Sequence, residues 1–127
     1  MMQSPTMSTG PLILLVDDDE GARDAAAECL VDEGYDVRVA SNGQDALELL
    51  DTLRPALLVV DWRMPVMSGQ ELLSSMRADT SLAAVPALIL TASHAWEIAV
   101  PNATFLQKPV RMQALRDAVR ACLQRAG

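Results

Sequence analysis

Runs of aliphatic residues alternate with amphipathic stretches along the chain after residue 10. The segments LILLV at 12–16 and ALLVV at 56–60 are uninterrupted apolar runs of strand length. Such runs are typical of parallel strands that are buried on both faces. Between the runs, apolar residues recur every three or four positions, which is the period of an amphipathic helix. The pattern therefore predicts strands and helices in alternation.

Five strand–helix units fit this alternation. Asp19 is the expected N-cap of the first helix and Gly34 its expected stop. The fourth helix is expected to be short, because Pro101 interrupts the stretch that would hold it. The predicted strands are 12–16, 35–40, 56–60, 87–90 and 104–106, and the predicted helices are 20–33, 42–53, 68–77, 93–98 and 110–124.

Five such units predict a doubly wound α/β fold, (βα)5, with a parallel five-stranded sheet in the order 2-1-3-4-5. Helices would cover both faces of this sheet. Residues 1–10 are polar and contain Pro5 and Gly10, so a flexible leader is expected there, followed by one domain over 11–127.

Composition and charge exclude several classes of protein. The 127 residues are 50% hydrophobic, which suffices for one core, and no apolar run reaches membrane-spanning length. The net charge of -7 argues against binding nucleic acid or an anionic membrane through bulk charge. Cys29 and Cys122 stand far apart and suggest neither a metal motif nor a disulfide framework. These features, with no signal peptide at the N-terminus, predict a cytoplasmic domain.

Acidic residues follow two strands that are neighbours in the predicted sheet. Asp17, Asp18 and Asp19 come after the first strand, and Asp61 comes after the third. Ligands of doubly wound folds bind beyond the carboxyl ends of the strands, where the strand order reverses. Asp17, Asp18 and Asp61 are therefore expected to converge, and such a cluster favours a hard cation such as Mg²⁺. Taken alone, the three consecutive acids also fit a solvated turn before a helix.

The fourth and fifth strands add two further groups at the same edge. Thr91 ends the fourth strand, and Lys108, the only lysine among ten basic residues, follows the fifth. A carboxylate can act as a nucleophile toward phosphorus, and a transferred phosphoryl group needs its oxygens neutralised. Mg²⁺, the Lys108 ammonium and the Thr91 hydroxyl would each take one oxygen of a phosphoryl group on Asp61. A cis Lys108–Pro109 bond would turn the lysine back over the strand ends.

Four motifs, in order, carry a resemblance to a known family. They are ILLVDD at 13–18, VVDWRMP at 59–65 with SG at 68–69, LILTA at 88–92 and FLQKP at 105–109. From about Leu12 onward, the chain resembles a bacterial response-regulator receiver domain, CheY-like in its flavodoxin-like fold. The resemblance implies two-component signalling, in which a sensor histidine kinase or a phosphotransfer protein donates a phosphoryl group to Asp61 with Mg²⁺ as cofactor.

The resemblance also implies a role for each matching residue at the metal. Asp18 and Asp61 would bind Mg²⁺ directly, Arg63 through its backbone carbonyl, and Asp17 largely through water.

The remaining implied roles concern the phosphoryl group and the response to it. Thr91 and Lys108 would bind the phosphoryl oxygens, and Thr91 and Phe105 would form the switch. The protein would then be a phospho-acceptor that changes its protein contacts, as a monomer or weak dimer, and not a turnover enzyme. Because the last predicted helix ends the chain, the protein is expected to be a stand-alone regulator or a receiver from a hybrid kinase.

The chain departs from the family pattern after Thr91. The segment 93–103 is shorter than usual, and Asn102-Ala103 replaces the usual Gly-Ala. Arg63 and Ser93 occupy positions that tune the phosphate lifetime in the family. An alternative function is an interaction module on the same fold that needs no phosphate. A Mg²⁺-dependent phosphatase with an aspartyl nucleophile would need a second Asp where Arg63 stands.

Other residues have plainer explanations. Trp62 and Phe105 fit ordinary core packing. Arg116 and Arg120 share one face of the last helix, which predicts a solvated face or, alternatively, a docking surface for an acidic partner.

Overall fold

Five parallel strands form the centre of the protein in the order β2-β1-β3-β4-β5, which is the predicted order. This arrangement comes from a computed structural model, which describes residues 10–64, 66–92 and 102–126. The strands are β1 (Leu12–Val16), β2 (Asp36–Ala40), β3 (Leu57–Asp61), β4 (Ala87–Thr91) and β5 (Ala103–Gln107).

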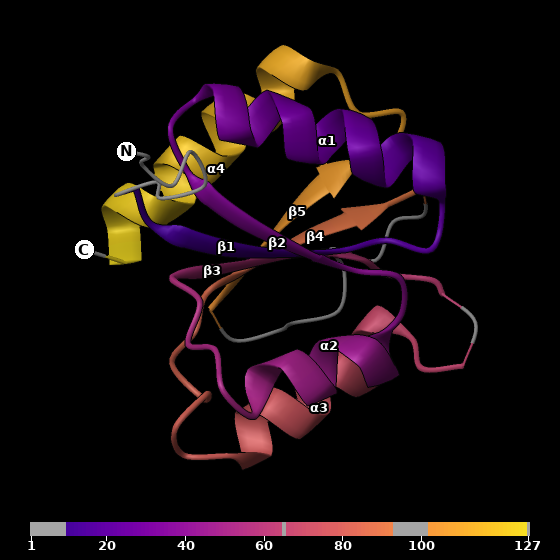
Figure 1. Ribbon diagram of the computed structural model, residues 1–127, viewed down its shortest axis with the longest axis vertical. Helices are drawn as coiled ribbons and strands as arrows, with labels where there is room; N and C mark the ends of the chain where they lie inside the picture. The colour runs from indigo at the N-terminus through magenta and orange to yellow at the C-terminus, as the bar shows by residue number, and fades with distance from the viewer. Residues whose placement is uncertain (1–9, 65, 93–101, 127) are drawn as a thin grey trace, which may run out of the picture.

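Helices cover both faces of the sheet, so the protein has three layers (Figure 1). α1 (Glu20–Asp32) and α4 (Met112–Ala126) lie on one face, and α2 (Gly43–Leu50) and α3 (Gly69–Ala78) lie on the other. The predicted helix at 93–98 lies outside the described residues. None of the described helices is long and apolar enough to span a bilayer.

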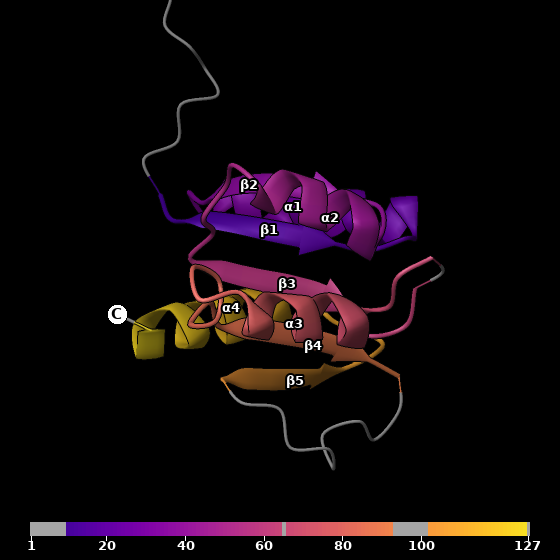
Figure 2. The same ribbon diagram turned by 90° about the horizontal axis from the view of Figure 1, so that it is seen from below.

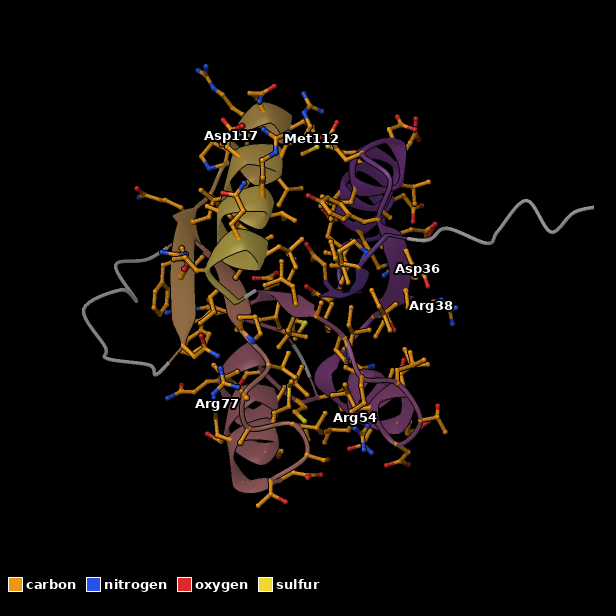
Figure 3. All side chains as sticks on the ribbon, turned by 90° about the vertical axis from the view of Figure 1, so that its left-hand side faces the viewer. Asp36, Arg38, Arg54, Arg77, Met112 and Asp117 are labelled. Carbon is orange, nitrogen blue, oxygen red and sulfur yellow. The ribbon has the colours of Figure 1, made fainter. Side chains whose placement is uncertain are left out.

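Burial of the three central strands explains why their sequences are nearly continuous apolar runs. Every residue of β3 and β4 is buried, whereas β2 and β5, at the two edges of the sheet (Figure 2), are only partly buried. Neighbouring residues of a strand point to opposite faces. Thus Leu14 and Val16 join the cluster under α2 and α3, while Ile13 and Leu15 join the cluster under α1 and α4. Side chains fill both spaces between the sheet and the helices (Figure 3).

The starts of the helices differ in how they are capped. The Asn42 side chain accepts the amide of Asp45 at the start of α2, and Ser68 and Glu71 form a reciprocal capping box at the start of α3. Asp19 occupies the N-cap position of α1, as predicted, but its side chain makes no capping hydrogen bond. Its own amide instead donates to the carboxylate of Asp17 at 3.0 Å. The acidic turn is therefore organised around Asp17.

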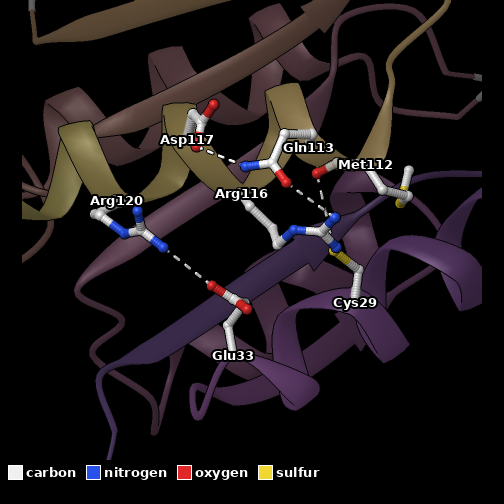
Figure 4. Close-up of polar contacts among 7 residues, drawn as sticks. All are labelled: Cys29, Glu33, Met112, Gln113, Arg116, Asp117 and Arg120. Atoms are coloured by element: carbon white, nitrogen blue, oxygen red, sulfur yellow. Dashed lines mark hydrogen bonds and ion pairs between the residues drawn. The ribbon is translucent and has the colours of Figure 1, made fainter.

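Polar contacts join α4 to α1 across the edge of their shared core (Figure 4). Arg116 Nη1 donates to Cys29 Sγ at 3.1 Å, and Arg120 Nη2 lies 3.2 Å from Glu33 Oε1. The expected solvated face is confirmed for Arg120, whose side chain is 56% exposed, while Arg116 is half-buried against Cys29. A docking role for this face stays a prediction. These contacts link α4 to the second half of α1 and to the residue that follows that helix.

A second arginine network joins α3 to the start of β5. Arg77, labelled in Figure 3, donates from Nη1 to the carbonyls of Ala83 and Val85 at 3.1 and 2.8 Å. Its Nη2 also donates to the Asn102 carbonyl at 3.4 Å. Burial lowers the pKa of the Arg77 guanidinium. The network fixes the start of the edge strand whose far end leads to Lys108.

We predict that Gly69→Ala lowers the free energy of unfolding by about 1–3 kcal/mol. A Cβ atom at Gly69 would lie 2.5 Å from the Asp61 carbonyl oxygen and 3.1 Å from the Trp62 Cα, because α3 begins against the end of β3. Urea denaturation of the variant and the parent measures the difference. A variant as stable as the parent would rule out this close approach.

Gly21→Ala is the matched control for this substitution. Nothing lies within 4 Å of a Cβ built at Gly21 in α1. Since alanine is the better helix former, Gly21→Ala should raise the free energy of unfolding by about 0.5–1 kcal/mol in the same measurement.

Candidate functional site

Three carboxylates meet at the carboxyl ends of β1 and β3. The register pairs Val16 with Val60, so the next residues of the two strands, Asp17 and Asp61, lie side by side. One carboxylate oxygen each from Asp17, Asp18 and Asp61 lie within 4.8 Å of one another. Asp17 is only 3% exposed and Asp61 6%, whereas Asp18 is exposed. The structure thus brings together the acids that the strand order predicts to converge.

Lys108 reaches the same cluster from the end of β5. Its Nζ lies 3.0 Å from Asp61 Oδ2, and its amide donates to the Thr91 carbonyl at 2.8 Å. The Lys108–Pro109 bond is cis. A cavity of about 250 Å³ at this point is lined by Asp61, Arg63, Thr91, Ala92 and Lys108. The phosphoryl-binding residues expected from the sequence therefore border one cavity beside the acidic cluster.

Asp17 is held by hydrogen bonds to several of its polar groups. Its amide donates to the Ala40 carbonyl at 3.2 Å, and its Oδ1 accepts the Asp19 amide at 3.0 Å. Its carbonyl oxygen accepts Arg23 Nη1 of α1 at 3.1 Å. The residue is consequently fixed by β2, by its own turn and by α1.

Burial raises the pKa of Asp17, and it does so more than any other influence on this carboxyl. The nearby charges of Asp61 and Asp18 also raise its pKa, while the Asp19 amide and Lys108 lower it. The net upward direction means that the surroundings disfavour the ionised carboxylate. A cation or a proton bound at the cluster would relieve this unfavourable charge.

Asp61 is positioned by the loop that follows it. The amide of Arg63 donates to Asp61 Oδ1 at 3.3 Å, so one carboxylate oxygen faces the loop and the other faces Lys108. The Trp62 amide donates to Leu90 of β4, and the Gly69 amide donates to the Trp62 carbonyl. The start of α3 is therefore fastened to the end of β3 next to Asp61.

The donor set of the cluster fits Mg²⁺. The three carboxylates are hard oxygen ligands, they carry more negative charge than Lys108 offsets, and one of them is exposed to solvent. Mg²⁺ is usually bound by one or two carboxylates and keeps several waters, which an open edge of this kind allows. The roles of the Arg63 carbonyl and the Thr91 hydroxyl remain predictions.

Phe105 lies outside this cavity but contacts a neighbour of Asp61. Its ring packs edge-on against Trp62, with centroids 5.9 Å apart and an interplanar angle of 69°. Trp62 is 8% exposed, and Phe105 is partly buried against the same core cluster. The plain expectation of core packing is confirmed for both rings.

Two contributors to the site were not identified from the sequence. Arg23 is one polar residue of an amphipathic helix, and nothing in its spacing indicates that its side chain turns back to Asp17. Gly69 appears in a matching motif, but its close approach to the Asp61 carbonyl is visible only in the structure.

Comparison with known proteins gives relatives in signalling. The chain is 33% identical over 118 residues to the response regulator MprA of Mycolicibacterium vanbaalenii, covering 89% of this chain and 50% of MprA. It is 34% identical over 117 residues to the sensor histidine kinase TmoS of Ectopseudomonas mendocina, covering 88% of this chain and 12% of TmoS. The chain thus spans about half the length of MprA and a small part of TmoS.

Solved structures and a family model agree with these relatives. The chemotaxis response regulator CheY4 of Vibrio cholerae superposes with a TM-score of 0.84 at 28% identity, covering 90% of this chain and 99% of CheY4. A family model described as the response regulator receiver domain matches residues 13–120. The protein therefore belongs to the response regulator receiver domain family, the CheY-like receiver domains of two-component systems.

Proposed function

We propose that this receiver domain accepts a phosphoryl group on Asp61 in a Mg²⁺-dependent reaction and then changes its protein contacts. The observation that carries the proposal is the 3.0 Å contact of Lys108 Nζ with Asp61 Oδ2 at the edge of the three-carboxylate cluster. A fixed cation beside a buried carboxylate suits a group that must receive a phosphoryl group, since the transferred oxygens are themselves anionic.

The proposed donor is a phosphohistidine of a sensor histidine kinase or of a phosphotransfer protein. An oxygen of Asp61 attacks phosphorus and forms a new O–P bond as the P–N bond breaks. The bonding electron pair stays on the imidazole nitrogen, which takes up a proton from solvent. The similarity to TmoS, a sensor histidine kinase, supports this class of donor.

Each remaining group would offset charge on the phosphoryl oxygens. Lys108 donates to one oxygen, and the hydroxyl of Thr91, which lines the same cavity, donates to a second. When bound, Mg²⁺ supplies positive charge for a third oxygen and for the acids themselves. It would be held by Asp18 and Asp61, by Asp17 largely through water, and by the backbone carbonyl of Arg63.

Thr91 and Phe105 would transmit the structural effect of phosphorylation to the protein surface that changes its contacts. They lie on adjacent paired strands, where Ile89 is opposite Phe105 and Thr91 is opposite Gln107. The Trp62 ring, one residue from Asp61, contacts the Phe105 ring. A shift of Thr91 toward a phosphoryl group would therefore act on the strand that carries Phe105.

We predict that acetyl phosphate with Mg²⁺ adds one phosphoryl group to the parent protein, detected by intact-mass spectrometry. Asp61→Asn should give no adduct, because the amide is not a nucleophile for this transfer. Asp51→Asn, at the exposed C-cap residue that follows α2, is the matched control and should react like the parent. Stoichiometric labelling of Asp61→Asn would refute the acceptor assignment, and an unlabelled parent would favour the phosphate-independent interaction module.

We also predict that Asp17→Asn raises the thermal midpoint by about 3 °C in EDTA at pH 7. Because the pKa of Asp17 is raised in the folded state, its ionised form destabilises the fold at neutral pH. This destabilisation should be lost as the pH falls through the raised pKa toward the ordinary value of 3.8. The variant should therefore gain less stability than the parent on mild acidification.

Added Mg²⁺ should raise the midpoint of the parent and raise that of Asp17→Asn less, since binding to the folded state stabilises it. Asp24→Asn removes an exposed acid of α1 and should respond to Mg²⁺ as the parent does. Differential scanning calorimetry in EDTA and in Mg²⁺ measures each midpoint. Equal midpoints for the parent and Asp17→Asn in EDTA would show that the buried charge has no such effect.

A further inference from the structure

Arg23 brings a positive charge to the acidic cluster without pairing with any of its acids. Its Nη1 donates to the backbone carbonyl of Asp17 at 3.1 Å. Within the described part of the chain, no carboxylate oxygen lies within 4.0 Å of this guanidinium. Lys108, by contrast, contacts Asp61 Oδ2 directly. Lys108 and Arg23 therefore have different partners, a carboxylate for Lys108 and the main chain for Arg23.

The carbonyl that Arg23 contacts belongs to the peptide unit between Asp17 and Asp18. A peptide unit is planar, and the Cα atoms of both residues lie in its plane. The orientation of this plane therefore influences the directions in which both side chains leave the backbone. A hydrogen bond to its carbonyl oxygen restrains the rotation of the unit, and with it the two acids that would face a metal ion.

Other contacts restrain Asp17 but act elsewhere on it. The Asp17 amide donates to Ala40 on β2, and the Asp17 carboxylate accepts the Asp19 amide. Neither contact involves the carbonyl of the unit that leads to Asp18. Arg23 is thus the side chain in the described structure that donates to this carbonyl.

The backbone of Arg23 is fixed in the first turn of α1. Its amide donates to the Asp19 carbonyl at 2.9 Å in the first turn of α1. Its half-buried side chain also lines a cavity of about 450 Å³ beside Val39, Ala40 and Ser41 at the end of β2. The guanidinium therefore links α1 to the residue that follows β1, and it does so beside the end of β2.

We infer that Arg23 is a positioning residue of the proposed metal site: it fixes the Asp17–Asp18 peptide so that both carboxylates face one cation. The inference rests on the proposed function, because it assigns Arg23 to the Mg²⁺ site of that reaction. Because the guanidinium bonds to a neutral carbonyl, it leaves the carboxylates available to the metal.

The direction of the effect distinguishes positioning from simple electrostatics. If Arg23 acted only through its charge, removing it would lessen the repulsion of Mg²⁺ and tighten binding. If it acts by fixing the peptide, removing it weakens binding, as the loss of outer contacts does at other metal sites.

The test is Mg²⁺ titration of the full chain by isothermal calorimetry. Arg23→Ala should weaken Mg²⁺ binding about 10-fold. Arg23→Lys, which keeps the charge and a donor, should recover part of that loss. Arg23→Met keeps the apolar stem without donors and should lose as much as Arg23→Ala, so it serves if the alanine variant does not fold. Arg38→Ala is the control. In the parent, Arg38 Nε lies 3.4 Å from Asp36 Oδ1 on β2, so this variant should bind Mg²⁺ as the parent does.

The possible failures are distinguishable. Suppose that the parent binds Mg²⁺ and that Arg23→Ala or Arg23→Met binds it equally or more tightly. This result would overturn the inference about Arg23 and leave the proposed function standing. A parent that binds no Mg²⁺, or that binds it equally well after Asp18→Asn, overturns the proposed function and the inference with it.

Discussion

β1 and β3 pair in parallel, with Val16 beside Val60. The acidic residues at the carboxyl ends of these two strands therefore lie at the same edge of the sheet. Because successive strand residues alternate between faces, a slip of one residue would move every core side chain of β1 to the opposite face. The buried runs of both strands therefore fix the register, and the register fixes the closeness of Asp17 and Asp61. The apolar core thus determines where the charge lies.

The charge at this edge is unbalanced. Two acids are buried and a third lies beside them, while one lysine contacts one of them. Burial and neighbouring charge disfavour the ionised form of Asp17, and only hydrogen bonds and Lys108 oppose that effect. An arrangement that is unfavourable without a ligand and favourable with a cation couples metal binding to the stability of the fold. A phosphoryl group, which is anionic, would in turn require such a cation.

The helical layers support the loops that carry these residues. Arg23 of α1 donates to the residue that follows β1. The other end of α1 is joined to α4 through the ion pair of Glu33 with Arg120. On the other face, α3 starts so close to β3 that Gly69 leaves no room for a Cβ beside the Asp61 carbonyl. The two buried acids are therefore restrained both at the strand ends and by a neighbouring helix, Asp17 through Arg23 of α1 and Asp61 through the start of α3.

The sequence by itself determined the strand–helix alternation and the residues at the strand ends, because the buried central strands leave continuous apolar runs that are read locally. The strand order followed from the match of five such units to a doubly wound fold. The sequence also indicated that Asp17, Asp18, Asp61 and Lys108 would meet, since parallel strands end at one edge. Only the tertiary structure decided that Arg23 bonds to the Asp17 carbonyl, that Arg116 and Arg120 face α1, and that the Asp19 side chain does not cap its helix. These contacts depend on where long polar side chains end in three dimensions, and the spacing of residues along a helix does not encode that.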